Sequence, residues 1–327
     1  MLKIYQRQNG GLKGALIPEG EAVPADSVWI DLFNPTPEER LVVGTALGLE
    51  MPSRADMEEI EVSSRIYQEE GGTFMTALVL SNAESERPVA DVVTFVLTQD
   101  KLVTLRYIDP QPFRTFAARC ERGGSAVNVA NGELALTSLL DVIVDRMADI
   151  LERMGAEVES VSREIFGDHT TGKPMASQDF QNVLRMLGRK HDLSGKMREC
   201  LLTLSRMMSF LNQAMDDKKH KDIRAHVKTL TRDIQSLQDH TSYMSSKMSY
   251  LQDATLGLIN IDQSNIIKIM SVVSIVFLPP TLFASIWGMN FTHMPEMHEI
   301  WAYPVSLGIM VISAVLPYWI FKRRGWL

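Results

Sequence analysis

The stretch IMSVVSIVFLPPTLFASIWGMNF, residues 269–291, contains no Asp, Glu, Lys or Arg. A second uncharged stretch, IWAYPVSLGIMVISAVLPYWIF, follows at residues 300–321, close to the end of the chain. As a helix, a stretch of about 22 residues is long enough to cross a hydrocarbon core of about 30 Å. The sequence therefore predicts a hairpin of two membrane helices at the C-terminus, preceded by a much longer water-soluble body.

Charges beside the two stretches predict their orientation. Basic residues flank the hairpin at its inner ends, namely Lys268, Lys322, Arg323 and Arg324. The connecting loop carries Glu296 and Glu299 but no Lys or Arg. By the positive-inside rule the loop faces outward and both termini face the cytoplasm. No apolar signal segment follows Met1, so we expect a multi-pass protein of the cell (inner) membrane.

The composition excludes several functional classes. Of the 327 residues, 22% are charged and the net charge is −7, which argues against a chain buried wholly in lipid and against a nucleic-acid binder. Cys120 and Cys200 lie far apart and outside any metal-ligand spacing, so we expect ordinary buried thiols in a reducing compartment. No HExxH, Walker A or dinucleotide motif is present, and we expect neither an enzyme nor a bound organic cofactor.

The water-soluble body begins with a small α/β domain, predicted over residues 1–130. Segments rich in β-branched and aromatic residues predict strands at residues 28–33, 73–80, 92–98 and 102–107. The last two flank a short polar turn, as the strands of a hairpin do. Between the strands, Thr36 with Pro37 and Glu39 has the pattern of a capped helix start.

A long-helix stalk is predicted over residues 131–265. Helical periodicity predicts helices at residues 134–166 and 177–214, with a break at 167–174 and a polar turn at 216–219. An apolar seam with steps of three and four follows: Val227, Leu230, Ile234, Leu237, Thr241, Met244, Met248, Leu251, Thr255 and Leu258. Such a seam requires a partner helix, from the same chain or from a neighbouring subunit.

The membrane domain is predicted over residues 266–327, with helices at about 266–288 and 301–321 and an outer loop at 289–300. Polar residues recur on one track of the first helix, which comprises Ser264, Ile267, Ser271, Ser274, Leu278, Thr281 and Ser285. Hydroxyl groups in a bilayer helix avoid lipid, so this track either packs against another helix or lines a wet path. A single hairpin buries little, and a track that spans the membrane favours several copies around an axis. Leu278 would then form an apolar ring.

The segment Trp287-Gly288-Met289-Asn290-Phe291 is followed by Met294-Pro295-Glu296-Met297 and a second helix with a basic end. This arrangement closely resembles the CorA-type divalent-cation channels, which typically carry Gly-Met-Asn-Phe and then Met-Pro-Glu-Leu. The resemblance implies a funnel-shaped homopentamer in which the first membrane helices line the pore and Mg²⁺ is both the transported and the regulatory ion. Neutral amide oxygens at the outer mouth suit a hydrated Mg²⁺.

The resemblance also assigns individual residues. It places Gly288, Met289 and Asn290 in the selectivity motif, and pore-facing positions on Thr281, Leu278, Met270 and Ser264. Family members often have Asn where this chain has Ser264, and usually a single Pro where this chain has Pro279-Pro280. The acidic loop residues Glu296 and Glu299 would attract cations to the outer mouth.

A regulatory metal site between neighbouring cytoplasmic domains is implied as well. Counting back along the helix from the Gly-Met-Asn motif assigns one half of this metal site to Asp253. Aligning Glu58-Glu59-Ile60 with the family's acidic pair assigns the other half of the site to Glu59. Loss of the bridging ion at low cytoplasmic Mg²⁺ would loosen the ring of subunits and open the pore. For Glu59 a merely solvated acidic face is the alternative.

Two alternative functions remain open. His293 and His298 in the outer loop suit zinc, cobalt or nickel, as in transporters of the same superfamily. A membrane-anchored coiled-coil scaffold would use the hairpin only as an anchor. The preferred interpretation is a magnesium channel whose partners are further copies of itself, the lipid bilayer and divalent cations.

Overall fold

The computed structural model describes residues 1–8, 11–18, 21–69, 71–122, 129–166, 177–214, 221–289 and 299–324. The chain divides into two compact units. The first unit comprises Met1–Pro174 and Gln181–Gln252, and the second comprises Met175–Phe180 and Asp253–Leu327. The break predicted at 167–174 and the turn predicted at 216–219 lie outside the described residues.

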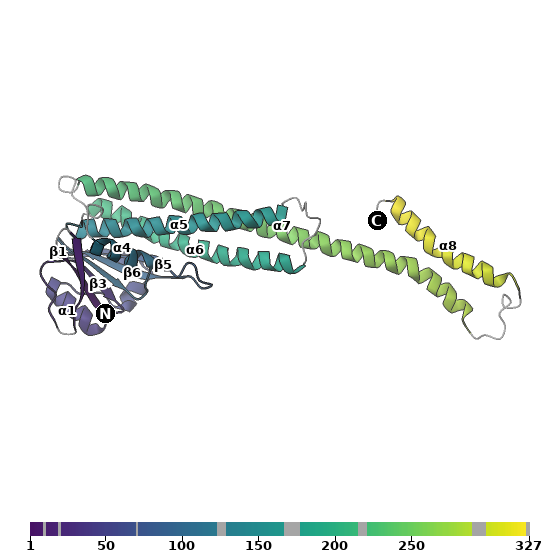
Figure 1. Cartoon of the computed structure of the whole chain (residues 1–327), viewed down its shortest axis with the longest axis horizontal. Coiled ribbons are helices and arrows are strands. Elements are labelled where there is room, and N and C mark those ends of the chain that lie inside the picture. Colours follow the sequence, from purple (N-terminus) through teal and green to yellow (C-terminus); the bar gives the residue numbers. More distant parts are fainter. Residues whose placement is uncertain are drawn as a thin grey trace. The chain divides into compact units, whose positions relative to one another are not determined.

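The first unit is built on a seven-stranded sheet with the order β2-β1-β3-β7-β6-β5-β4 (Figure 1). The strands are β1 (Leu2–Gln8), β2 (Gly11–Leu16), β3 (Ser27–Phe33), β4 (Ile66–Glu69), β5 (Gly72–Ser81), β6 (Val89–Leu97) and β7 (Leu102–Arg106). Strands β3 and β7 pair in parallel, and the other neighbours pair antiparallel. The four predicted strands are confirmed as β3, β5, β6 and β7, including the β6–β7 hairpin. Strands β1, β2 and β4 were not predicted.

Three short helices cover one face of the sheet: α1 (Pro37–Leu47), α2 (Arg54–Glu58) and α3 (Val62–Arg65). Ile30 and Leu32 of β3 pack here in one buried cluster with Val43 of α1. The predicted helix start is confirmed, because Thr36 Oγ1 accepts the Glu39 N–H at 3.2 Å and the Glu39 carboxylate accepts the Thr36 N–H at 3.0 Å. This reciprocal pair satisfies two amides that the helix itself leaves free.

The opposite face is covered by α4 (Gln111–Arg122) and α5 (Gly132–Phe166). Trp29 of β3 is fully buried there, stacked on Tyr5 with a centroid distance of 4.2 Å and 5.0 Å from Phe116 of α4. Helix α5 starts against the β6–β7 turn, where the Gly132 N–H donates to the Asp100 carbonyl at 2.8 Å. A Cβ at Gly132 would lie 2.3 Å from the Lys101 carbonyl carbon, so only glycine allows this close approach.

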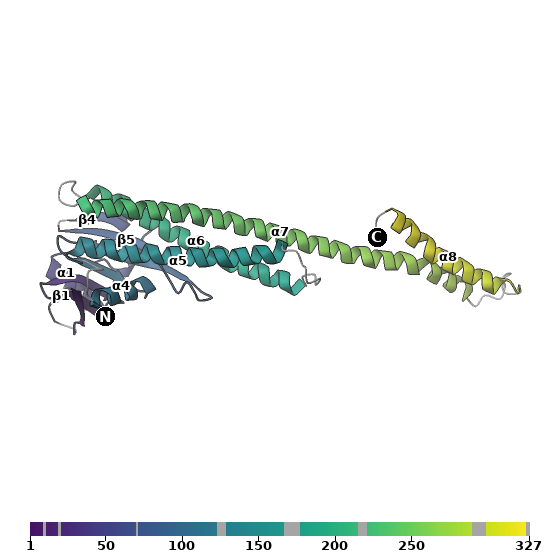
Figure 2. The ribbon, with the colours of Figure 1, turned by 45° about the horizontal axis from the view of Figure 1, so that its top comes forward.

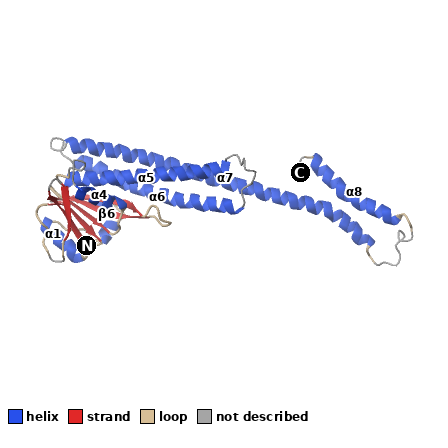
Figure 3. Cartoon of the chain, viewed as in Figure 1, coloured by secondary structure: helices blue, strands red, loops and turns tan. Residues whose placement is uncertain are grey.

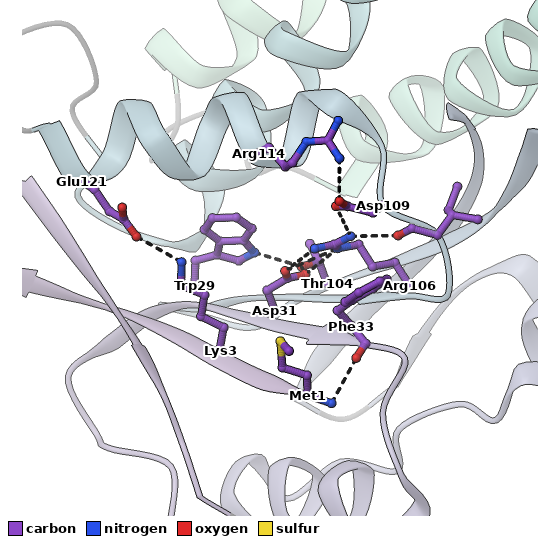
Figure 4. Close-up of polar contacts among 11 residues, drawn as sticks. Met1, Lys3, Trp29, Asp31, Phe33, Thr104, Arg106, Asp109, Arg114 and Glu121 are labelled. Atoms are coloured by element: carbon purple, nitrogen blue, oxygen red, sulfur yellow. Dashed lines mark hydrogen bonds and ion pairs between the residues drawn. The ribbon is translucent and has the colours of Figure 1, made fainter. Parts of the chain in front are cut away.

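A buried ion pair joins the two parallel strands (Figure 4). Arg106 Nη2 of β7 lies 2.9 Å from Asp31 Oδ2 of β3, and their side chains are 8% and 6% exposed. Thr104 Oγ1 donates to Asp31 Oδ1 at 2.8 Å and accepts the Trp29 indole N–H at 2.9 Å. Because these buried polar groups satisfy one another, they favour a single register between β3 and β7.

Helix α5, the part of α6 (Ser177–Ala214) from Gln181 and the part of α7 (Lys221–Trp287) up to Gln252 lie side by side in the first unit (Figures 1 and 2). These bounds confirm the predicted helices at 134–166 and 177–214. The seam residues Val227, Leu230, Met244, Met248 and Leu251 are at most 2% exposed. Lys247 of α7 pairs with Glu159 of α5, and Ser245 of α7 lies 3.3 Å from Ser194 of α6. Up to Leu251, the partner helices of the seam therefore come from the same chain.

The connection between β5 and β6 is tied to α5 through Glu84. Its Oε1 accepts from Arg146 Nη2 at 2.8 Å and from Arg153 Nη1 at 2.7 Å. These two guanidinium groups lower the pKa of Glu84 from an ordinary value of 4.5 to about 2. A carboxylate whose folded-state pKa is depressed stabilises the fold above its unfolded pKa, and this contribution is lost as the pH falls from about 4.5 to about 2.

We expect the substitution Glu84→Gln to lower the Tm at pH 7 and to have almost no effect at pH 2. Because the pair is solvent-exposed, the expected shift at pH 7 is small, about 1–2 °C. Thermal melts followed by circular dichroism at both pH values would measure it. Glu86→Gln is the matched control, since Glu86 is 79% exposed and pairs with the 62%-exposed Arg189. An equal effect of Glu84→Gln at both pH values would contradict the assignment.

The second unit contains the end of α7 and α8 (Ala302–Arg323), drawn as helices in Figure 3. Both helices are long and apolar enough to cross a membrane. The most apolar segment of each helix contains no buried residue. Phe277 is 66% exposed and Val311 61% exposed. Helices that are apolar all round are stable in lipid or in a protein core rather than in water. Helix α7 ends one residue before the predicted boundary at 288, and α8 ends two residues after 321.

Candidate ion path and metal sites

Helix α7 runs without interruption through the whole polar track of the first membrane helix. Every member of the track, Ser264, Ile267, Ser271, Ser274, Leu278, Thr281 and Ser285, is exposed. Met270 is 65% exposed and borders the track, three residues after Ile267 and four before Ser274. The structure thus brings all predicted pore-facing positions onto one side of one helix.

Three hydroxyl groups of the track donate their protons within the helix. Ser264 Oγ donates to the Asn260 carbonyl at 2.8 Å, Ser274 Oγ to Met270 at 2.9 Å, and Thr281 Oγ1 to Phe277 at 2.7 Å. A hydroxyl oxygen that has donated its proton still has lone pairs that accept. The water molecules around a hydrated cation point their protons outward. This face can therefore accept hydrogen bonds from the hydration shell of a cation.

Pro279 and Pro280 lie inside α7, beside Leu278 of the track. Neither has an amide proton, so the carbonyls of Ile275 and Val276 lose their usual helical donors. Free carbonyls at membrane depth are tolerated where they are buried in protein or face water. This local gap in the hydrogen-bond ladder coincides with the predicted apolar ring.

The C-terminal end of α7 closes at the first residues of the predicted selectivity motif. The Gly288 N–H donates to the Ala284 carbonyl at 2.9 Å, and the Met289 N–H donates to Ile286 at 3.3 Å. Asn290, Glu296, His293 and His298 lie outside the described residues. Of the two acidic residues predicted to attract cations, Glu299 is described and exposed, directly before α8.

One contact at the start of α8 was missed by sequence analysis. The Trp301 indole N–H donates to Glu299 Oε2 at 3.1 Å. The only signal in the sequence was a glutamate two residues before a tryptophan. The side chains of such a pair can also point away from each other, so the spacing alone does not predict a hydrogen bond.

The predicted regulatory residues lie in different units. Glu59 is exposed at the C-terminal end of α2, where the neighbouring Glu58 pairs with Arg54 at 2.7 Å and Arg65 donates to the Glu59 carbonyl. Asp253 is exposed on α7, eleven residues or about three turns before Ser264, and so lies on the same track. In the described part of the chain, no three Asp, Glu, His or Cys side chains converge as metal ligands. A site shared between two subunits stays a prediction.

Both cysteines are free and buried, as predicted. Burial raises the pKa of the Cys120 and Cys200 thiols to about 12. Because the thiolate is the reactive form, both residues are poorly reactive at neutral pH.

A model of the family described as CorA-like Mg²⁺ transporter protein matches residues 24–323, nearly the whole chain. The chain belongs to this CorA family. A magnesium transport protein CorA from Pasteurella multocida is 35% identical over 303 residues, 92% of each chain. The CorA of Salmonella typhimurium is 32% identical over 327 residues, all of each chain.

The CorA fold is shown independently by solved structures. The complete CorA magnesium transporter from Methanocaldococcus jannaschii has a TM-score of 0.73 at 17% identity, covering 100% of this chain and 99% of that one. The predicted family and fold class, an α/β domain with long helices and two C-terminal membrane helices, are thereby confirmed. Membership of the CorA family places the chain among transporters and not among enzymes.

Proposed function

We propose that this chain conducts Mg²⁺ into the cytoplasm through a homopentameric pore lined by α7. The observation that carries the proposal is the uninterrupted exposed track from Ser264 to Ser285 in a member of the CorA family. A helix in a single hairpin has no partner along this track, whereas copies around an axis would turn it toward a shared path. The names of the two relatives above, both magnesium transport proteins, support Mg²⁺ over zinc, cobalt or nickel.

The chemistry of the track suits a hydrated divalent cation. Magnesium releases its water reluctantly, so a path that accepts hydrogen bonds from the hydration shell avoids the cost of stripping it. Ser264, Ser274 and Thr281 offer such acceptors, and Asn290 is proposed to offer amide oxygens at the outer mouth. A ring formed by Leu278 would interrupt the path by dewetting when it narrows.

The orientation is proposed from the charges at the helix ends. Lys322 and Arg323 lie in the last turn of α8, and Lys268 lies near the corresponding end of the α7 apolar segment. Glu299 lies at the opposite end of α8. This asymmetry supports a multi-pass inner-membrane protein with both termini in the cytoplasm. Influx is then driven by the ion gradient and the membrane potential.

Closure is proposed to depend on divalent cations bound at Asp253, with Glu59 of a neighbouring subunit as the second half of the site. We expect Asp253→Lys to raise the cytoplasmic Mg²⁺ concentration needed for half-closure by about tenfold, within the usual range of allosteric couplings. Mg²⁺ currents from excised patches at stepped cytoplasmic Mg²⁺ would measure this shift. Asp262→Lys is the matched control, because Asp262 lies on the opposite side of α7. Unchanged inhibition in Asp253→Lys would rule out the assigned site.

Flux measurements on the purified full-length protein in liposomes test the function as a whole. Separate gradients of Mg²⁺, Zn²⁺, Co²⁺ and Ni²⁺ are applied, and entry is followed with ion-selective dyes. We expect Mg²⁺ to enter on its own. We also expect each of the other ions to reduce Mg²⁺ entry by competition when it is added together with Mg²⁺. Entry of Zn²⁺ without Mg²⁺ would replace the ion assignment with the zinc alternative. No entry of any ion by a correctly inserted oligomer would favour a membrane-anchored scaffold.

A further inference from the structure

The start of α8 holds a carboxylate beside an indole ring. The Trp301 N–H donates to Glu299 Oε2 at 3.1 Å, and Trp301 remains 57% exposed. A hydrogen bond to a charged acceptor is stronger than one between neutral groups. It therefore restricts a glutamate side chain that would otherwise sample several rotamers in water.

The backbone orients the same two residues. The Glu299 carbonyl accepts the Ala302 N–H at 3.1 Å, and the Trp301 carbonyl accepts the Val305 N–H at 3.2 Å, so both residues belong to the turn that leads into α8. Trp301 occupies the N-cap position, and its side chain makes no capping bond. The indole N–H, which can only donate, bonds to Glu299, and the carboxylate is held at the helix end that favours negative charge.

An indole ring also determines depth in a bilayer. Tryptophan prefers the boundary between hydrocarbon and water, where its ring is apolar and its N–H finds a polar partner. Trp301 is the first aromatic residue of the second membrane stretch. Anchoring of its ring therefore sets the height of the Glu299 carboxylate above the hydrocarbon.

We propose that Trp301 is a positioning residue for cation capture, which holds the Glu299 carboxylate at the outer membrane surface where Mg²⁺ approaches the pore. The inference rests on the proposed function, because it requires an outward loop and Mg²⁺ influx. Fixed carboxylates repeated around an axis raise the local concentration of a divalent cation, and salt screens this effect. Trp301 should therefore affect uptake at low Mg²⁺ and not the rate at saturation.

The test measures Mg²⁺ influx into proteoliposomes as a function of external Mg²⁺ in the Trp301→Phe protein, which keeps an aromatic ring and loses the N–H. We expect the half-saturating concentration to rise about threefold, in keeping with the loss of one hydrogen bond, with an unchanged maximal rate. The increase should disappear at an ionic strength of about 1 M, where the screening length is about 3 Å. In the Glu299→Gln background, Trp301→Phe should cause no further change, because Trp301 acts through Glu299.

Trp319→Phe, at the opposite end of α8, is the matched control and should leave the half-saturating concentration unchanged. Trp301→Tyr, which keeps an interfacial ring but moves the donor, is the second variant should Trp301→Phe fail to assemble. An unchanged half-saturating concentration in the assembled variant, or an added loss in the Glu299→Gln background, would overturn the inference. A wild-type protein that carries no Mg²⁺ would instead refute the proposed function.

Discussion

The substitution Asn290→Ala is expected to abolish Mg²⁺ uptake while leaving membrane insertion and the oligomer intact. In the proposed pore, a ring of Asn290 amides holds the hydrated ion at the outer mouth, and alanine removes every one of these oxygens. Several hydrogen bonds of about 1 kcal/mol each exceed the ~2.7 kcal/mol that corresponds to a hundredfold change. We therefore expect a loss of about 100-fold or more.

Liposome flux and growth of a magnesium-dependent host would both measure this loss. Asn265→Ala is the matched control. Asn265 is exposed on α7 and directly follows Ser264, so its side chain is turned away from the track by about 100°. The control protein should retain wild-type flux. Wild-type flux in Asn290→Ala would show that the outer motif does not select the ion, and wild-type growth would favour a simple anchor.

The second large effect is expected from a cysteine at Thr281. In a pore, Thr281→Cys faces water, so a charged, membrane-impermeant methanethiosulfonate reagent should modify it and block Mg²⁺ flux almost completely. The native protein provides a silent background, because Cys120 and Cys200 are buried and burial raises their pKa to about 12. Flux before and after treatment, with the modified fraction measured by mass spectrometry, would give the result.

Phe283→Cys serves as the control at nearly the same membrane depth. Two residues further along a helix turn the side chain by about 200°, away from the track. The reagent should leave this variant conducting. If Thr281→Cys were unreactive in the native oligomer, the hydroxyl track would be a packing surface between helices, and the proposed pore would be wrong.

The sequence predicted the centre of the sheet and missed both edge strands, β2 and β4, as well as β1. Strand β6 consists largely of β-branched and aromatic residues, and β5 contains Thr73, Phe74, Thr76 and Val79, which gives a clear signal. Strand β1 contains Lys3, Gln6 and Arg7, and β2 contains two glycines, so local composition argues against both. Their stability comes from pairing with β3 and from burial of residues such as Ile4, which is a property of the folded domain.

Helix α4 was missed for a related reason. Pro110 and Pro112 at its start suggest a loop, although proline is compatible with the first turn of a helix. Phe113 and Phe116 are fully buried and hold α4 on the sheet. The spacing of these aromatic residues became informative only once the opposite face of the sheet was known to carry Trp29 and Phe95.

For the candidate site, residue spacing alone predicted which side chains of α7 share a face. Spacing did not decide which helices cover the seam, because an apolar stripe is equally suited to a partner from the same chain or from another subunit. The bundle with α5 and α6 decided this in the first unit. The Trp301–Glu299 contact could not be predicted either, since it depends on the rotamers of two exposed side chains.

The internal hydrogen bonds of Ser264, Ser274 and Thr281 have a consequence for anions. With their protons engaged by backbone carbonyls, these side chains offer no donor to chloride or phosphate. At these three positions the proposed lining would therefore disfavour negative ions without any fixed charge of its own. Since serine and threonine do not titrate in the physiological range, that discrimination should stay constant when the acidity on either side of the membrane changes.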